Sequence, residues 1–358
     1  MKRRLIELDF VRGVGILAVM AYHYVGVTKA PDAVARKVVF LSSSGWAGVD
    51  LFFVLSGYLV AGLLFSEYKR TNDVRFGRFL FRRALKIWPS YYFYLLIQVI
   101  VRRHPLSSFL VQNLSNLQNY LGTSLEHTWS LAVEEHFYIV LAALFAAWKS
   151  ERISKLWFFR ISAFLCAAIL ILRVALVFSG HPGGVAAYTH TRLDSMLFGV
   201  MLAWLSFFDH SIFKKMVDAK YTLCILAVAA AIFALAVPKS SPIMLSVGFT
   251  ILYLGSGAFI LLITGHAGKV KEWRLFKFVA WIGFYSYSIY LWHLSVREPI
   301  QKLLSRYLSG SVSWWLAPFV EAVTAIIVSV ALSRMIEWPI LKMRDRLMPE
   351  KEIQAVAA

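Results

Sequence analysis

Long apolar runs alternate with short polar connections along the whole chain. Each run approaches the roughly 20 apolar residues that a helix needs to cross a bilayer. The pattern predicts ten spans, at 7–27, 45–66, 78–102, 129–148, 160–179, 191–208, 221–237, 243–264, 278–300 and 313–340. The expected fold class is therefore all-α: a polytopic transmembrane helical bundle in which residues 1–358 form one membrane-embedded domain, with no separate soluble domain.

Composition agrees with a membrane protein, because 59% of the 358 residues are hydrophobic and only 16% are charged. A soluble domain of this length could not bury so much apolar surface. The two cysteines, Cys166 and Cys224, fall inside apolar runs, where we expect small buried side chains rather than a disulfide or metal ligands. No metal site is predicted.

The net charge of +18 is concentrated in alternate connections. The N-terminus, the C-terminal tail and the connections 67–86, 149–160, 214–220 and 269–277 are rich in Lys and Arg, and the connections between them are poorer. Cytoplasmic loops collect positive charge, so both termini are predicted to be cytoplasmic and the protein is expected in the bacterial cytoplasmic (inner) membrane. The basic residues are explained by topology and anionic lipid, and no nucleic-acid partner is expected.

Polar residues inside the first span are the first candidates for chemistry. Arg12 and His23 are eleven residues apart, which places them on one helix face at roughly 16 Å along the axis. Asp9 joins the same face. Ionisable side chains in hydrocarbon are costly and mark interior sites by default.

Two further clusters follow in the second and third spans. Asp50 needs a partner or water, and pairing with an arginine is as good an explanation as a functional role. Arg82, Arg83 and Lys86 serve as topological anchors in the simplest interpretation. In the functional interpretation, they form an anion site for the phosphates of a soluble cofactor.

The segment around residue 130 carries acidic and hydroxyl groups that membrane insertion does not require. Ser130 and Glu134 form one stripe with Tyr138 at helical spacing. Glu134 is predicted to be a buried interior carboxylate, whereas Glu135 suits a solvated helix start. Trp129 is a candidate for stacking on a sugar, although interfacial anchoring explains most such tryptophans.

The second half of the chain adds three candidate positions or pairs. Arg192 and Asp194 can neutralise each other across a helix start. His293 lies among aromatic residues, where a lone histidine is usually structural. Glu337 precedes a proline and can pair with Arg334, three residues earlier.

Taken in order, these clusters resemble the acyltransferase-3 family of bacterial membrane O-acyltransferases. The resemblance extends over nearly the full length and rests on Arg12 to His23, the run Gly48 to Tyr58, Arg82-Arg83 with Ile87-Trp88-Pro89, Thr128-Trp129-Ser130-Leu131 before Glu134-Glu135, Arg192-x-Asp194 with Gly199, Ser286-Tyr287 with His293, and Glu337-x-Pro339. Position 136 departs from the family, which more often has Gln there than His.

The resemblance implies transfer of an acyl group, usually acetyl, from cytosolic acyl-CoA to a hydroxyl of a cell-envelope or secreted carbohydrate. Lipid-linked saccharides, lipopolysaccharide, peptidoglycan sugars and exopolysaccharides are the expected acceptors. His23 is predicted to be the general base or a transient acyl carrier. Arg12, with Asp9 beside it, would organise the donor or the oxyanion, and Glu134 would stabilise a histidine. Arg82, Arg83 and Lys86 would bind the phosphates of acetyl-CoA.

Two alternatives stay open at this point. The same polar stripe could form the path of a transporter or flippase for a lipid-linked saccharide. The acceptor could also be a lipid or a secondary metabolite.

Overall fold

The computed structural model describes residues 5–102, 106–150, 152–307 and 310–348, and every regular element in these ranges is helical. This confirms the all-α class. The first half forms α1 (Ile6–Ala21), η1 (Tyr22–Gly26), α2 (Ala33–Ser42), η2 (Gly45–Ala47), α3 (Gly48–Thr71), α4 (Phe76–Arg102), α5 (Leu106–Leu114), α6 (Gln118–Leu121), η3 (Glu126–Thr128) and α7 (Trp129–Lys149). The second half forms α8 (Lys155–Phe178), α9 (Thr189–Phe208), α10 (His210–Asp218), α11 (Lys220–Ala236), η4 (Met244–Gly248), α12 (Phe249–His266), η5 (Gly268–Glu272), α13 (Arg274–Phe284), α14 (Ser286–Leu304), α15 (Gly310–Leu332), η6 (Ser333–Glu337) and α16 (Trp338–Leu347).

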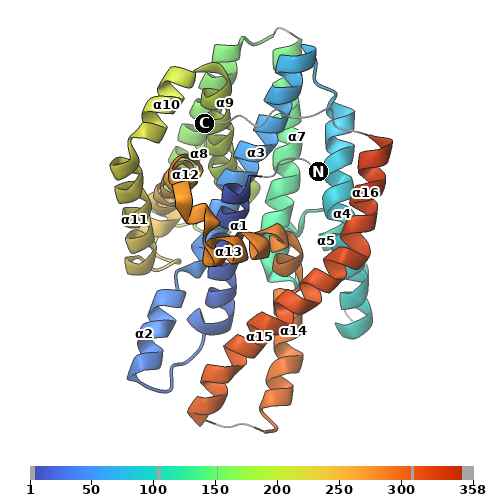
Figure 1. Ribbon diagram of the computed structural model, residues 1–358, viewed down its shortest axis with the longest axis vertical. Coiled ribbons are helices and arrows are strands. Elements are labelled where there is room, and N and C mark those ends of the chain that lie inside the picture. Colours follow the sequence, from blue (N-terminus) through green and yellow to red (C-terminus); the bar gives the residue numbers. More distant parts are fainter. Residues whose placement is uncertain (1–4, 103–105, 151, 308–309, 349–358) are drawn as a thin grey trace.

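Eight helical segments in the described ranges are long and apolar enough to cross a membrane, and a ninth follows if α10 and α11, bent by 71°, count as one span. The expected span 278–300 does not form one helix. It is divided at Tyr285, whose φ of −97° and ψ of 9° end α13 before α14 begins. α13 runs across the picture in Figure 1, whereas most of the long helices run along the vertical axis.

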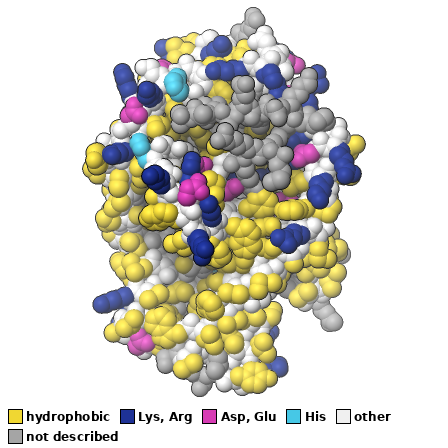
Figure 2. All heavy atoms as spheres, in the orientation of Figure 1, with side chains coloured by type: hydrophobic (Ala, Val, Ile, Leu, Met, Phe, Trp, Pro, Cys, Tyr) yellow, Lys and Arg dark blue, Asp and Glu magenta, His cyan; other side chains and the backbone are white. Residues whose placement is uncertain are grey.

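The basic connections that join α3 to α4 and α7 to α8 lie toward one end of the molecule. The ends of α3, α7 and α9 and the starts of α4, α8 and α10 meet at the top of Figure 1, and α2 and the α14–α15 connection lie at the bottom. In Figure 2, Lys and Arg side chains gather toward this upper end and hydrophobic side chains cover the middle of the visible face. This arrangement agrees with the predicted alternation. The side that faces the cytosol stays a prediction.

Glycines allow the central helices to touch backbone to backbone. A Cβ added to Gly57 of α3 would lie 2.0 Å from the Met196 carbonyl oxygen of α9, and one added to Gly199 would lie 2.1 Å from that of Val54. Small residues permit such close approach where lipid provides no hydrophobic driving force between helices. The α3–α9 contact therefore fixes the two helices that carry Asp50 and Arg192.

The close α3–α9 contact gives a first prediction. We expect Gly199→Ala to lower the thermal unfolding midpoint by several degrees, because the new methyl group has to displace backbone rather than a flexible side chain. Gly77→Ala is the matched control, since a Cβ there meets nothing within 4 Å. Equal midpoints for the two variants in lipid nanodiscs would contradict the close contact.

Candidate active site

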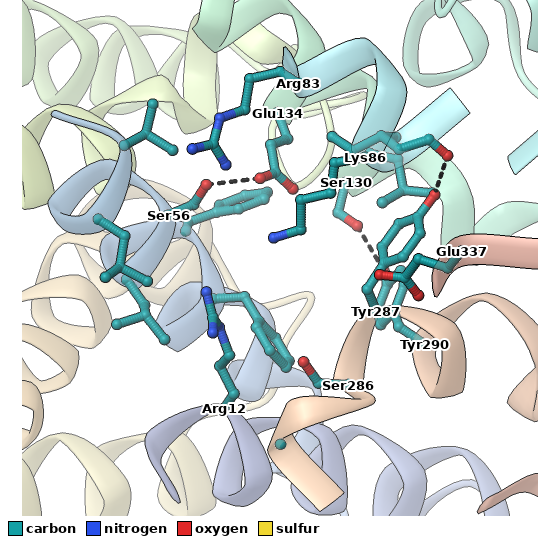
Figure 3. Close-up of a pocket in the computed structure, with 18 of the residues that line it drawn as sticks. Arg12, Ser56, Arg83, Lys86, Ser130, Glu134, Ser286, Tyr287, Tyr290 and Glu337 are labelled. Atoms are coloured by element: carbon teal, nitrogen blue, oxygen red, sulfur yellow. Dashed lines mark hydrogen bonds between the residues drawn. The ribbon is translucent and has the colours of Figure 1, made fainter. Parts of the chain in front are cut away.

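A central cavity of about 230 Å³ lies between α1, α3, α4, α7 and the C-terminal helices. Three basic and two acidic residues line it, namely Arg12, Arg83, Lys86, Glu134 and Glu337. In Figure 3, Arg12 enters from one side and Arg83 and Glu134 face it from the other. The cavity is thus a charged space with apolar walls, enclosed by helices that are otherwise apolar.

Glu134 is held by hydroxyl groups. The Ser56 hydroxyl donates to Glu134 Oε1 at 2.7 Å, as Figure 3 shows, and Tyr138 donates to the same oxygen. On the opposite wall, Arg12 Nη1 lies 3.1 Å from Asp9 Oδ1. Asp9 therefore orients Arg12, as their spacing on one helix face predicts.

An arginine basin of about 640 Å³ borders the central cavity at the basic end of the molecule. Five arginines and two acidic residues line it, namely Arg70, Arg75, Arg78, Arg82, Arg83, Glu67 and Asp73. Arg83 lines both spaces, so it marks the junction between the basin and the central cavity. The excess of arginine suits an anion with several phosphate groups.

A smaller histidine chamber, of about 50 Å³, lies on the other side of the central cavity. His23, Asp50, His127, Trp129, Arg192 and Lys239 are among the residues that line it. Val49 and Tyr290 line both the chamber and the central cavity, so they form the boundary between the two. The Tyr290 hydroxyl donates to the His127 carbonyl at 2.6 Å and is 2.6 Å from Ser130 Oγ.

His23 is paired with a second histidine from α14. His293 Nε2 is 3.1 Å from His23 Nδ1, and His293 Nδ1 is 2.7 Å from the Tyr290 carbonyl oxygen. A carbonyl can only accept, so in the neutral pair His293 carries its proton on Nδ1 and accepts at Nε2. His23 then donates from Nδ1, which leaves the lone pair on its Nε2. His23 is thereby held in the tautomer that a base requires.

The segment that carries His23 is a π-helical turn, η1, which continues α1 without a break. Single π-turns in helices are frequent at functional sites. The turn changes the register of the helix just where His23 stands, and Arg12 and His23 line different cavities. Arg12 therefore belongs to the central cavity and His23 to the histidine chamber that borders it.

Comparison with known proteins now identifies the family. A family model described as an acyltransferase domain matches residues 5–337. The chain belongs to this family. The predicted resemblance is confirmed.

Several curated relatives of this acyltransferase domain carry names of O-acetyltransferases. The peptidoglycan O-acetyltransferase OatA of Listeria monocytogenes is 26% identical over 94% of this chain and 56% of its own length. The O-acetyltransferase OatA of Staphylococcus aureus is 28% identical over 95% of this chain and 58% of its own length. The chain thus spans little more than half the length of these relatives. No solved structure matches it significantly.

The acyltransferase domain contains a buried quartet of charges beside the chamber. Arg192 Nη2 is 2.6 Å from Asp50 Oδ1, and Arg173 Nη1 is 2.7 Å from Asp194 Oδ2. All four side chains are at most 1% exposed. Asp50 therefore pairs with an arginine, but the expected Arg192–Asp194 pair is replaced by contacts to residues of other helices.

Two expected groupings are corrected by the structure. The hydrogen bonds described for Glu134 come from Ser56 and Tyr138, so Glu134 does not hold a histidine; His293 is the partner of His23. The second correction concerns the predicted phosphate site on α4, because Arg82 and Lys86 line different spaces.

Arg82 and Lys86 lie in different spaces. Arg82 donates to the Met348 carbonyl and lies 3.2 Å from Asp345, which holds it in the basin. Lys86 lines the central cavity instead. Only Arg83 borders both spaces, so it is the member of the predicted trio that connects them.

Of the remaining predicted residues, Trp129, Ser130 and Glu337 line these spaces and Glu135 does not. Trp129 lines the chamber, and Ser130 lines the central cavity beside Tyr290. Glu337 accepts from Ser333 Oγ at 2.8 Å, whereas Arg334 Nε lies 3.4 Å from the Tyr285 hydroxyl. Glu135 lines none of the cavities described above, and its buried Oε1 accepts no hydrogen bond in the described part of the chain.

Sequence reasoning missed a further cavity and its acidic residue. A space of about 380 Å³ between η1, α14 and α15 is lined by Tyr24, Gln301, Trp314 and Glu321, among others. We call it the Glu321 cavity. Glu321 is 1% exposed, and within the described residues neither of its carboxylate oxygens accepts a hydrogen bond; Arg297 Nε is 3.8 Å away. Glu321 and Arg173 both stand inside apolar runs of the sequence. A charged residue at such a position could have marked each of them as an interior site.

Proposed function

We propose that this protein transfers an acetyl group from acetyl-CoA to a hydroxyl of a cell-envelope carbohydrate, in the bacterial cytoplasmic membrane. The observation that carries the proposal is the series of three bordering spaces: the arginine basin, the central cavity and the histidine chamber. Arg83 joins the first two spaces, and Val49 and Tyr290 join the last two. A phosphate site, a passage and a base thus follow one another through the protein.

The donor fits this series by its shape and charge. The nucleotide of CoA carries several phosphate charges, and the arginine basin offers guanidinium groups that bind phosphate in bidentate geometry. The thin pantetheine arm enters the central cavity past Arg83. There Arg12 and Lys86 offer donors and Glu134 an acceptor for its amide groups. In this proposal Arg12 organises the donor.

His23 performs the acid–base chemistry. Its Nε2 removes the proton from the acceptor hydroxyl as the hydroxyl oxygen bonds to the thioester carbonyl carbon. When the tetrahedral intermediate collapses, the C–S bond breaks and the leaving sulfur takes the proton from His23. An ester and CoA thiol result, so atoms and charge balance. His293 holds the His23 tautomer throughout.

The Glu321 cavity supports a hydroxyl-rich acceptor. Its lining combines the buried Glu321 carboxylate, whose oxygens accept no hydrogen bond from the described residues although one lies 3.8 Å from Arg297 Nε, with an indole and the polar side chains of Thr28, Ser305 and Ser313. Carboxylates accept from sugar hydroxyls, and aromatic faces pack on sugar rings. Tyr24 lines this cavity and donates to the His293 carbonyl at 2.7 Å, which connects the cavity to the histidine pair. The name of the Listeria monocytogenes relative, a peptidoglycan O-acetyltransferase, points the same way.

Reconstitution of the full chain tests the proposed activity. The purified protein in nanodiscs is incubated with radiolabelled acetyl-CoA and peptidoglycan, lipopolysaccharide, exopolysaccharide or lipid acceptors. We expect label on a carbohydrate hydroxyl, as a base-labile ester. Movement of a lipid-linked saccharide across a liposome bilayer without acetyl transfer would identify a flippase, and label on lipid alone would overturn the carbohydrate assignment.

The size of the chamber predicts the acyl group. A space of about 50 Å³ holds only a few atoms beyond the side chains that line it. We expect kcat/KM for butyryl-CoA to fall about 10- to 100-fold below that for acetyl-CoA, because overfilling a packed site costs about 1–3 kcal/mol. CoA affinity, set in the arginine basin, should be the same for both donors. Equal kcat/KM for the two donors would contradict an acetyl-sized chamber.

A further inference from the structure

Arg192 has hydrogen-bond donors that no other described residue of the fold uses. The side chain is 1% exposed, and Nη2 binds Asp50. In the described residues, its Nε and Nη1 groups have no hydrogen-bond partner. An unsatisfied buried donor destabilises a folded protein, so two of them on one guanidinium call for an explanation.

The neighbouring arginine of the same quartet shows what a structural role looks like. Arg173 is equally buried and donates to the Ser246 carbonyl at 3.1 Å, the Thr191 carbonyl at 2.8 Å and Thr250 Oγ1 at 2.6 Å. It also pairs with Asp194. Arg173 uses its donors to join helices, whereas Arg192 leaves two of its nitrogens available.

The guanidinium of Arg192 is also held in place at the wall of the histidine chamber. Asp50 binds one end, and the Phe249 ring lies over its plane with 3.6 Å between Cζ and the ring centroid. Arg192 and His23 line the same space. By contrast, Arg12 lines the central cavity and binds Asp9.

We propose that Arg192 stabilises the oxyanion of the acetyl-transfer reaction in the histidine chamber; this inference rests on the function proposed above. As the acceptor oxygen bonds to the thioester carbon, the carbonyl π electrons move onto the carbonyl oxygen. Nε–H and Nη1–H of Arg192 then donate to that oxygen. When the C=O bond re-forms, the C–S bond breaks and the sulfur takes the proton from His23. Donors fixed before the reaction stabilise developing charge without reorganisation.

Asp50 becomes a positioning residue in this scheme. Its contact with Nη2 leaves the other two nitrogens of Arg192 for the reacting oxygen. The quartet of two arginines and two aspartates has no net charge, so the negatively charged oxygen meets no net negative charge there. Lys239, which also lines the chamber and lies 5.5 Å from the Trp46 ring centroid, adds positive charge at this wall.

A pair of matched lysine variants tests the proposal. Arg192→Lys retains the charge opposite Asp50 but loses the two donors, and we expect kcat for acetyl transfer to fall about 10²-fold with an unchanged KM for acetyl-CoA. Arg173→Lys loses three structural hydrogen bonds instead. It should lower the thermal midpoint more than Arg192→Lys does, while kcat per folded protein stays within about threefold of wild type. Arg192→Lys is thus expected to lose mainly rate, and Arg173→Lys mainly stability.

The outcomes are distinguishable. A kcat for Arg192→Lys within threefold of wild type, or an equal loss in folded Arg173→Lys, overturns the role of Arg192 and leaves the proposed function standing. Absence of acetyl transfer by the wild type overturns the proposed function itself. If Arg192→Lys does not fold, Asp50→Leu/Arg192→Met replaces the buried pair with apolar groups of similar size, a change that proteins often tolerate. Its kcat is expected to fall at least as far.

Discussion

Replacing His23 with alanine is expected to lower kcat for acetyl transfer about 10³-fold and to leave CoA affinity unchanged. The chamber then lacks the group that takes the hydroxyl proton, and general acid–base catalysis contributes about 10²- to 10⁴-fold. In the proposed function the donor is bound mainly in the arginine basin, which is a different space from the one that His23 lines. Transfer is measured with labelled acetyl-CoA, and CoA affinity by calorimetry, on the protein in nanodiscs.

His136→Ala is the matched control for this substitution. His136 is also a half-buried histidine, but it bonds Thr189 Oγ1 at 2.6 Å and lines none of the three spaces. We expect the control to retain at least half of the wild-type kcat. Wild-type activity of folded His23→Ala would remove histidine from the mechanism. Label bound to the wild-type protein in the absence of acceptor, and lost in His23→Ala, would show that His23 carries the acetyl group.

The second large effect is expected in the arginine basin. Arg82→Ala/Arg83→Ala should raise the Kd for CoA by about two to four orders of magnitude, because each charge-assisted contact to phosphate contributes about 1.5–3 kcal/mol. The salt dependence of binding should also weaken, since fewer cations meet the phosphates. Calorimetry at two salt concentrations measures both effects.

The control removes two charges from the same end of the molecule. Lys214→Ala/Lys215→Ala lies on exposed positions of α10, outside the basin. Its Kd for CoA should stay within about twofold of wild type. Similar losses in the two double variants would mean that general surface charge attracts CoA, and an unchanged Kd for Arg82→Ala/Arg83→Ala would place the nucleotide elsewhere.

The fold class and the first site residues could be predicted because each rests on local information. Membrane-length apolar runs determine an all-α bundle, and the cost of a charge in hydrocarbon marks Arg12, Glu134 and Arg192 wherever they stand. Asp9 and Arg12 are three residues apart on one helix, so their contact also follows from spacing alone.

Contacts between helices could not be predicted in this way. The pairs Arg192–Asp50 and Arg173–Asp194 join residues of different helices, and helical spacing carries no information about which faces meet. The same holds for His23 and His293, which are 270 positions apart. The apolar pattern predicts where helices run but not where they change register or break. The π-turn at His23 and the break at Tyr285 could therefore not be predicted from it.

The boundary formed by Val49 and Tyr290 has a consequence for the cell's energy supply. A membrane protein with polar spaces entered from opposite faces would short-circuit the proton-motive force if water filled them as one column. Tyr290 is tied to the His127 carbonyl and to Ser130, and it stands between the central cavity and the chamber. If the acyl donor and the acceptor reach these spaces from opposite faces, as the proposed reaction requires, this aromatic ring and Val49 are the barrier that separates the water of one space from that of the other.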